Sequence, residues 1–360
     1  MSRDDILKNI ADDETIANCS VESVDLSDID FTGVRFENIE FTSCDFSKST
    51  INKTGFKACT FKRCIFEGID FKELFWQKLS VEESSFKDAN LSKCKFVNMN
   101  FSGSDFTKAD LTQTIFIKTT LDESKFERNN LFKTSIVDSS LCDVKILTCD
   151  LVKTTFFKVD MSGVKFIDTD LSKVVLMECE LQDQDFSNAT LEMVQFNNSD
   201  LSGSCFDGAN MFLSNFLEST LNACTFISAT CNNTIFTKAS LVDADFTKAS
   251  LYQANFAEAN LQGVNFKDTN LQQTYFVSAT CKETNFDGAD ASYANFNYVE
   301  FDKSFINNTN FTYSSMHESI FKESDLDDTK CFGLKKTDPD LAEAKEWSVP
   351  QSIFKEKTDD

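Results

Sequence analysis

Thirteen cysteines and one histidine are the side chains of this 360-residue chain that could most directly do chemistry. Thiolates and imidazole nitrogens bind zinc, and a cysteine beside a histidine can act as a nucleophile. However, no two cysteines have the CxxC spacing of a metal site. His317 has no second histidine to act with, and its outward position in the five-residue period described below predicts a surface residue. The chain also lacks the GxGxxG, P-loop and HExxH motifs. We therefore expect no catalytic residues, no metal and no cofactor, and hence a protein that is not an enzyme.

A period of five residues organises most of the chain. From Ile16 to Cys331 every fifth residue is apolar, over 64 consecutive positions. Phe fills 31 of these central positions, which is most of the 38 Phe in the chain. A period of five fits neither a helix, with 3.6 residues per turn, nor a strand, with a period of two. The chain must therefore turn a corner every five residues around one continuous core.

The neighbours of each central residue follow the same period. Two positions before a centre the side chain is mostly small, and one position before it Asp or Asn is frequent. Small side chains leave room beside the rings, and Asp or Asn can satisfy backbone groups at a corner. Nine of the ten Gly lie two positions after a centre, where a turn needs a permissive backbone. Eleven of the cysteines fall in the two inward phases as core side chains, and only Cys142 and Cys205 are expected outside.

The repeating unit resembles the motif of the pentapeptide repeat family. Units such as 109–112 (Ala-Asp-Leu-Thr) and 259–262 (Ala-Asn-Leu-Gln) carry the resemblance, which covers residues 16–333. It implies an all-β fold, a right-handed quadrilateral β-helix with four pentapeptides per coil. About 16 coils at ~4.8 Å each would give a solenoid ~75 Å long. From Leu181 to Phe286, Phe and Leu centres mostly alternate, which predicts Phe on two opposite sides of the core.

Both ends of the chain depart from the repeat. Residues 1–15 predict an N-terminal capping helix with Ser2 and Asp5 as a capping box, followed by the β-helix over 16–333. Residues 334–360 predict a C-terminal helix, over 341–347 and with Pro339 at its start, and a tail. Helices at the two ends would cover the open core of a solenoid. Trp347 and Phe354 would either pack against the last coil or dock a partner.

The formal net charge of −23 restricts the partners. It argues against direct contact with nucleic-acid phosphates and with anionic membranes. The sequence shows neither a signal peptide nor an apolar run long enough to span a membrane. Thirteen reduced thiols suit a cytoplasmic protein, with export through a specialised secretion system left open. We expect a protein partner or self-association and no small-molecule substrate.

Two groups of outward-facing apolar or aromatic residues are candidate partner-binding sites. If a coil takes four pentapeptides, side chains four repeats apart stack on one side of the rod, and a column of exposed apolar groups usually binds something. Tyrosine is favoured at interfaces, although local packing at the end of the rod is the other explanation. The apolar column is Val97, Ile117, Val137, Phe157 and Met177, and the tyrosine group is Tyr293, Tyr298 and Tyr313, with Phe305 beside it.

Two charged stripes follow the same spacing. They are either solvated ladders on a soluble rod or a charge-matched surface for a protein partner. The acidic stripe contains Glu83, Glu123, Asp143, Asp183, Asp243, Glu283 and Glu323, with Gly103, Gly163, Gly203, Ala223, Gly263 and Lys303 between them. The basic stripe contains Lys53, Lys93, Lys133, Lys153 and Lys173, with Glu73 and Gln113 between them.

These features favour a non-enzymatic protein–protein interaction scaffold, such as a bacterial accessory or effector protein. The alternative is a DNA mimic that binds or protects a topoisomerase such as gyrase, as some members of the family do. Residues 31–334 hold 42 acidic and 28 basic residues, a net charge of −14. Duplex DNA ~75 Å long carries ~44 charges, so the rod is much less charged than its proposed counterpart. Gyrase-protecting members also carry loops that interrupt the register, whereas this register is unbroken.

Overall fold

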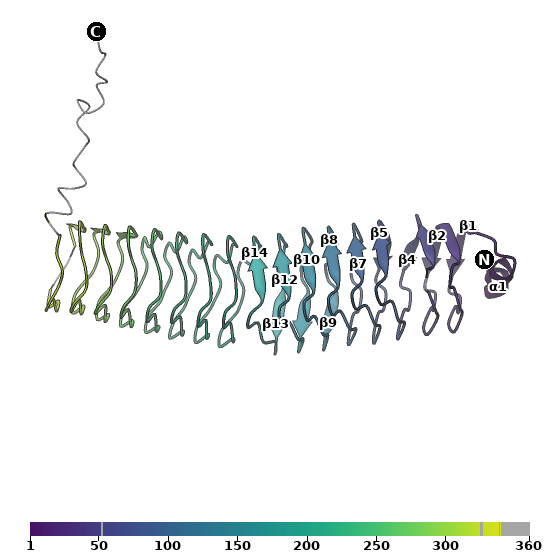
Figure 1. Ribbon diagram of the computed structural model, residues 1–360, viewed down its shortest axis with the longest axis horizontal. Coiled ribbons are helices and arrows are strands. Elements are labelled where there is room, and N and C mark those ends of the chain that lie inside the picture. The colour runs from purple at the N-terminus through teal and green to yellow at the C-terminus, as the bar shows by residue number, and fades with distance from the viewer. Residues whose placement is uncertain (52, 325–326, 338, 340–360) are drawn as a thin grey trace, which may run out of the picture.

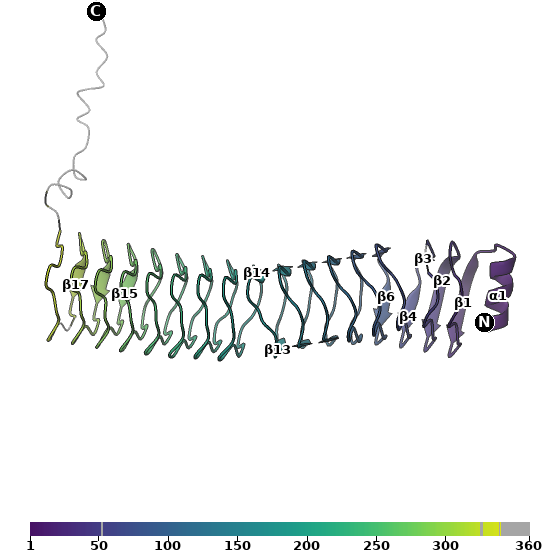
Figure 2. The same ribbon diagram turned by 60° about the horizontal axis from the view of Figure 1, so that its bottom comes forward.

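The computed structural model describes residues 1–51, 53–324, 327–337 and 339, and most of them form one straight-sided rod (Figures 1 and 2). Helix α1 (Arg3–Ala11) lies across the N-terminal end. The Ser2 hydroxyl accepts a hydrogen bond from the Asp5 N–H, and the Asp5 carboxylate accepts one from the Ser2 N–H, so the predicted capping box is present. Ile6 is fully buried against the first coil. The helix therefore covers the N-terminal end of the core.

Each coil of the rod takes four pentapeptides, because its bridges join residues that lie four repeats apart in the sequence. The first bridge pairs Ile16 with Phe36, the last pairs Ser315 with Lys335, and all pairs are parallel. Each coil therefore has four sides, with one apolar centre on each side. The solenoid has about 15 turns, close to the predicted 16. The predicted all-β solenoid is confirmed.

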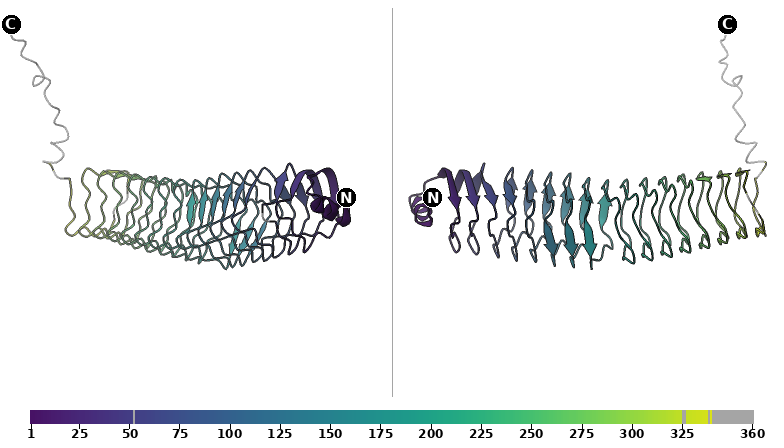
Figure 3. Two further views of the ribbon diagram at one scale, coloured as in Figure 1. Left: turned by 45° about the vertical axis from the view of Figure 1, so that its right-hand side comes forward. Right: turned by 180° about the vertical axis from the view of Figure 1, so that it is seen from behind.

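Short strands mark the sides where three or more consecutive residues are extended (Figure 3). One sheet contains β1 (Ile16–Glu22), β2 (Arg35–Thr42), β3 (Gly55–Lys57), β4 (Thr60–Lys62) and β6 (Ser80–Glu82). A second contains β5 (Phe75–Gln77), β7 (Lys95–Val97), β8 (Ile115–Ile117), β10 (Ser135–Val137), β12 (Thr155–Phe157) and β14 (Val175–Met177). On the opposite side lie β9 (Lys125–Glu127), β11 (Lys145–Leu147) and β13 (Lys165–Ile167). Near the C-terminal end lie β15 (Thr280–Lys282), β16 (Glu300–Asp302) and β17 (Ile320–Lys322).

Between residues 181 and 286, phenylalanine rings fill the core in two stacked columns. Phe226 and Phe246 are parallel with ring centroids 4.3 Å apart, and both are fully buried. Phe226 meets Phe236, from the opposite side of the coil, edge to face at 6.0 Å. Stacked and edge-to-face pairs are the favoured geometries of aromatic rings. The predicted placement of Phe on two opposite sides is therefore confirmed.

Hydrogen bonds from short side chains fix the corners. The Thr114 hydroxyl, two positions before a centre, donates to the carbonyl of Leu91 in the preceding coil at 2.7 Å. The Asp30 carboxylate, one position before a centre, accepts from the N–H of Thr32 at 2.9 Å. Both arrangements recur along the rod, so the small and Asp or Asn positions satisfy backbone groups as expected.

The residue two positions after each centre adopts the left-handed backbone conformation. Nine glycines occupy it, with φ from 65° to 79°, and the tenth, Gly55, does not. Many other residue types also take this conformation, with φ from 47° to 65°. A branched Cβ is disfavoured there, and among the described non-glycine residues with positive φ only Thr148 is β-branched. The backbone thus restricts the residue type at one position in five.

The ends of the rod differ from the prediction of a uniformly buried core. Phe321 is 37% exposed, Cys331 is exposed and Cys19 is half-buried. All three are at inward positions, but inward residues in the outermost coils have a neighbouring coil on one side only. The predicted helix over 341–347, Trp347 and Phe354 lie outside the described residues.

The ring columns lead to a stability prediction. Phe226→Ala removes a ring that stacks on two others, and we expect the free energy of unfolding to fall by about 3–5 kcal/mol. Phe305→Ala is the matched control, because its ring is 51% exposed, and it should change stability by less than about 1 kcal/mol. Denaturant unfolding followed by circular dichroism measures both. Equal losses would show that the stack does not carry the stability.

The aspartate caps lead to a pH prediction. The hydroxyl and N–H of Ser162 donate to Asp160 and hold its pKa below the ordinary value of an aspartate. A lowered folded-state pKa stabilises the fold above the unfolded pKa of about 3.9, and this contribution is lost as the pH falls through the folded value. Asp160→Asn keeps a side-chain oxygen that can accept both hydrogen bonds from Ser162, just as the Asn100 side chain accepts two from Ser102. The amide, however, does not titrate.

We expect the melting temperature of Asp160→Asn to fall less steeply than that of the wild type below about pH 4. Asp138→Asn is the control, because Asp138 is exposed and accepts no such hydrogen bond from the residues that the structure describes. Thermal melts between about pH 2 and pH 7 test this. Parallel curves for the wild type and Asp160→Asn would contradict it.

Candidate functional site

The six-stranded sheet of β5, β7, β8, β10, β12 and β14 presents an apolar surface on one side of the rod. The central residue of each three-residue strand points into the core, so both flanking residues point outward. The strands pair in register and place the predicted apolar residues in one column, each partly exposed. That column, in order along the rod, is Val97, Ile117, Val137, Phe157 and Met177.

A second outward column on the same sheet was missed by the sequence prediction. Phe75 is 53% exposed, Ile115 is 37% exposed, and Val175 is half-buried. They lie one position before a centre, and their spacing by whole coils was the signal that could have found them. Lys95, Ser135 and Thr155 complete this column in the paired register. We call the first column together with Phe75, Ile115 and Val175 the apolar face.

Three lysines border one long edge of the apolar face. Lys133, Lys153 and Lys173 each lie two residues before β10, β12 and β14 respectively, at three consecutive coils, and all three are exposed. In the described part of the chain none of them forms an ion pair. At the other edge, by contrast, Lys158 pairs with Glu178 at 3.4 Å. We call the three residues the lysine edge.

The corner that carries the lysine edge continues along the rod with uncharged residues. Asn233 donates to Gln253 at 3.0 Å, and Gln253 donates to Gln273 at 2.8 Å. Tyr293 and Tyr313 follow at the next two coils, stacked with ring centroids 5.2 Å apart. The structure thus brings two of the three predicted tyrosines together.

Tyr298 lies at another corner, a quarter of a coil further along the chain. Its ring meets His317 edge to face, with centroids 5.3 Å apart. His317 was predicted to be a surface residue, and this prediction is wrong, because the side chain is only 5% exposed. The Tyr298 ring and the neighbouring Glu318, whose carboxylate lies 3.2 Å from Nε2, cover it. The five-residue period predicts that the His317 side chain points outward, but it does not predict which residues cover it.

Most cysteines are unsuited to thiolate chemistry. Burial raises the pKa of Cys94, Cys179 and Cys224 to about 12, so these thiols stay protonated at neutral pH. Cys142 and Cys205, predicted to face outward, are half-buried. Across the residues that the structure describes, no three Cys, His, Asp or Glu side chains gather as a metal site would require.

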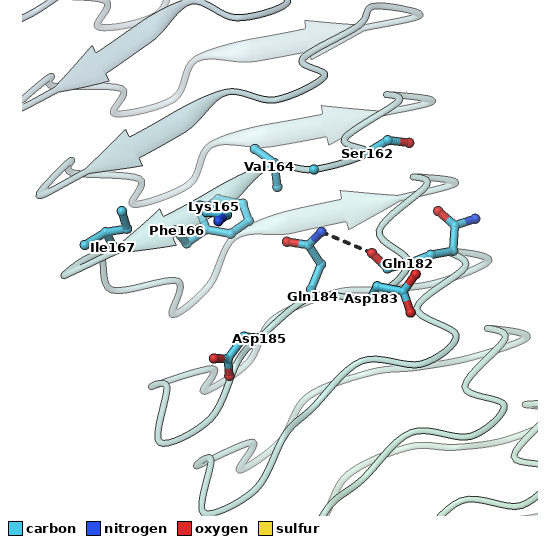
Figure 4. A pocket seen from close by; sticks show the side chains of 10 residues that line it. Ser162, Val164, Lys165, Phe166, Ile167, Gln182, Asp183, Gln184 and Asp185 are labelled. Atoms are coloured by element: carbon cyan, nitrogen blue, oxygen red, sulfur yellow. Dashed lines mark hydrogen bonds between the residues drawn. The ribbon is translucent and has the colours of Figure 1, made fainter.

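A break in the hydrogen-bond ladder forms a surface hollow of about 700 Å³ (Figure 4). It lies between β13 and the following coil and is lined by 162–167 and 182–185. Residues 162–170 and 182–190, all of them described, share no bridge and no backbone hydrogen bond. We call this break the seam.

Gln184 offers a physical cause for the seam. It occupies the inward position that holds Val164 in the coil before and Ser204 in the coil after, and it is the longest side chain at that position along the rod. Its amide nitrogen donates to the carbonyl of Gln182 at 3.2 Å and it remains buried (Figure 4). The hollow is therefore a packing defect lined by mixed polar and apolar groups.

Comparison with protein families agrees with this geometry. The family model for pentapeptide repeats (8 copies) matches 25–63, 84–122, 214–253, 239–276, 254–290 and 270–308, and the model for a pentapeptide repeat region matches 139–211. Together the matches cover more than half of the chain. The chain belongs to the pentapeptide repeat family. A search of curated proteins finds no match.

Several solved structures of pentapeptide repeat proteins are similar to this chain. A trypsin-treated variant of QnrB1, a plasmid-mediated fluoroquinolone resistance protein, is 20% identical, with 56% of this chain and 90% of that chain covered and a TM-score of 0.33. HetL, involved in heterocyst differentiation regulation in the cyanobacterium Nostoc sp. strain PCC 7120, is 17% identical, with 73% and 90% covered and a TM-score of 0.24. Rfr23 from the cyanobacterium Cyanothece 51142 is 20% identical, with 38% and 88% covered and a TM-score of 0.17. Likenesses at this level concern the fold alone.

The seam leads to a prediction about Gln184. In Gln184→Ser, the hydroxyl should donate to the carbonyl 23 residues earlier, as Ser204 does to Leu181 at 3.2 Å. We expect the ladder to close, the amides of 165–168 to exchange with solvent more slowly, and stability to rise by about 1 kcal/mol. Hydrogen exchange with mass spectrometry measures this. Gln113→Ser, at an exposed position, is the control, and unchanged exchange in Gln184→Ser would rule out this cause.

Proposed function

We propose that this pentapeptide repeat protein is a non-enzymatic, cytoplasmic scaffold that binds another protein through the apolar face. The observation that carries the proposal is the outward apolar column over five paired strands, from Val97 to Met177, with Phe75, Ile115 and Val175 beside it on the same sheet. Isolated exposed apolar residues need no explanation, but contiguous apolar patches on a soluble protein usually bind something. Among the described residues, no helix is long and apolar enough to cross a membrane.

The construction of the sheet supports this role. Its backbone is held by hydrogen bonds between coils, so little conformational entropy is lost when a partner binds. Six strands at ~4.8 Å spacing give a surface ~24 Å long. A typical interface buries about 800 Å² of surface on each partner. In an interface of this size the apolar face would form the buried centre, and the flanking corners would form the polar rim.

The acidic stripe gives the alternative function, a DNA mimic, less support than the apolar face gives the scaffold. Asp143, Asp183 and Asp243 lie against Gly163, Gly203 and Gly263 of the next coil, in the space that a Cβ would occupy there. The left-handed backbone allows Gly at these positions, but the Gly carries no charge, so apart from Glu123 and Asp143 the acidic groups between Glu83 and Glu283 are at least two coils apart. Charges two coils apart are ~9.6 Å from each other, far wider than the mean spacing of duplex DNA.

Site-specific photocrosslinking tests the proposed function. We expect a photoreactive phenylalanine analogue at Val137 to crosslink a partner protein in the native cell. The same analogue at Leu147, which is half-buried on the opposite side in β11, should not. Phe157→Asp should abolish the crosslink, because it places a charge in the apolar face, whereas Phe305→Asp, at an exposed ring elsewhere, should keep it. Equal crosslinking from both positions, or none from Val137, would refute the proposal.

A further inference from the structure

The lysine edge and the apolar face together define the chemistry of the partner. We infer that the partner is an amphipathic α-helix with acidic side chains along one flank, which lies along the rod with its apolar side on the apolar face and its acidic flank on the lysine edge. This inference rests on the proposed function, since it concerns the same surface. It adds the class of partner and its orientation.

The lysine edge stacks like charges on consecutive coils, as does a second row on the opposite side, Lys125, Lys145 and Lys165 in β9, β11 and β13, where Lys125 pairs with Glu127 at 2.7 Å. Elsewhere a lysine often pairs with a glutamate at the same position of the neighbouring coil, as Lys57 does with Glu37 at 3.2 Å and Lys93 with Glu73 at 3.3 Å. Opposite charges on neighbouring rungs attract, whereas like charges repel. The lysine edge stacks three cations on consecutive coils in a chain of net charge −23. Folding does not neutralise them, so an anionic partner gains from their proximity.

The apolar face decides which kind of anion fits. A nucleic acid or an acidic polysaccharide could match the lysines, but it would leave the apolar column of Val137, Phe157 and Met177, on the same three strands, uncovered. The ligand must be apolar on one side and anionic at one edge, within the width of a single sheet. An amphipathic helix has this form, because its side chains at i, i+3, i+4 and i+7 share one face and the next residues around share a flank.

The dimensions of the rod match a helix that lies along its axis. Successive coils are ~4.8 Å apart and successive helical turns 5.4 Å apart, so each turn can place one apolar residue near each strand. The ~24 Å between β5 and β14 corresponds to about 16 helical residues. Such helix-on-surface binding, with anchors spaced by three or four residues, is a common mode of peptide recognition.

The two edges of the apolar face fix which way the acidic flank points. The edge that follows the strands carries charges of both signs, with Lys118, Asp138, Lys158 and Glu178 at consecutive coils. Lys158 and Glu178 already neutralise each other. Of the two edges, only the lysine edge offers an uncompensated row of cations, so the acidic flank lies there.

A second copy of the chain fits this surface less well. Two-fold packing of the apolar face on itself has two simple forms. With the axis across the rods, the lysine edge of one copy meets the lysine edge of the other. With the axis along the rods, it meets the mixed edge at the same coils, so Lys133 and Lys173 would face Asp138 and Glu178, while Lys153 would face Lys158. The first form sets lysines against lysines and the second neutralises two of the three, whereas an acidic helix neutralises all three.

Binding of designed peptides to the full-length protein tests the inference. The probe is a fluorescein-labelled helical peptide with leucines on one face and glutamates along one flank, and about 18 residues make it long enough to span the apolar face. A second peptide carries lysines in place of the glutamates, and a third has the composition of the first in scrambled order. In fluorescence anisotropy we expect the acidic peptide to bind at least about tenfold more tightly than either, and its affinity to fall with added salt.

A triple charge reversal tests the role of the lysine edge. Lys133→Glu/Lys153→Glu/Lys173→Glu should weaken acidic-peptide binding at least about tenfold and should favour the basic peptide. The matched control reverses three exposed lysines at another corner in the same backbone conformation, and should leave both affinities unchanged. The control residues are Lys48, Lys108 and Lys248, with φ of 57°, 59° and 60°, against 58°, 61° and 63° in the lysine edge.

Three outcomes would overturn the inference. One is equal binding of acidic and basic peptides, and another is an equal loss in both triple variants. The third is a dimer in analytical ultracentrifugation that Phe157→Asp dissolves, which would make a second copy the occupant. If any of these occurs while the crosslink from Val137 persists, the helix chemistry is wrong and the proposed function stands. If the crosslink is also absent, both fail.

Discussion

Each coil hydrogen-bonds to the next with a shift of four pentapeptides, and side chains four repeats apart are therefore held one above another. The N–H of Leu91 donates to the carbonyl of Asp110 at 2.8 Å, and the same pattern recurs along the rod except at the seam. Paired backbone groups satisfy the polar atoms that would otherwise be buried without partners. Every column described above, apolar, basic, acidic or aromatic, exists because of this register.

The register makes each side chain depend mainly on the residues one coil away. In the core this favours rings that stack, as between Phe226 and Phe246. On the surface it joins an aspartate to a glycine, as with Asp143 and Gly163, because the carboxylate fills the space of the missing Cβ. The seam shows the opposite case, since one long side chain, Gln184, coincides with the loss of hydrogen bonds across a side of the rod.

A rod of this kind can recognise a partner without any moving part. The apolar face and the lysine edge are held by the same ladder that holds the core, so their relative position is fixed before binding. Residues on one corner also change gradually along the rod, from lysines to an amide ladder and then to stacked tyrosines. Different segments of one corner thus present different side-chain chemistry to a partner.

The sequence by itself determined which side chains point inward and which outward, because direction depends only on the position within the pentapeptide. It therefore predicted the solenoid, the ring columns, the left-handed corner positions and the column that contains Phe157. Only the tertiary structure decided what lies next to each outward residue. It added Phe75 and Ile115 to the apolar face, buried His317 under Tyr298, opened the seam beside Gln184 and exposed Phe321 in the last coil. The physical reason is that these outcomes depend on contacts between coils and at the ends, which a local period does not contain.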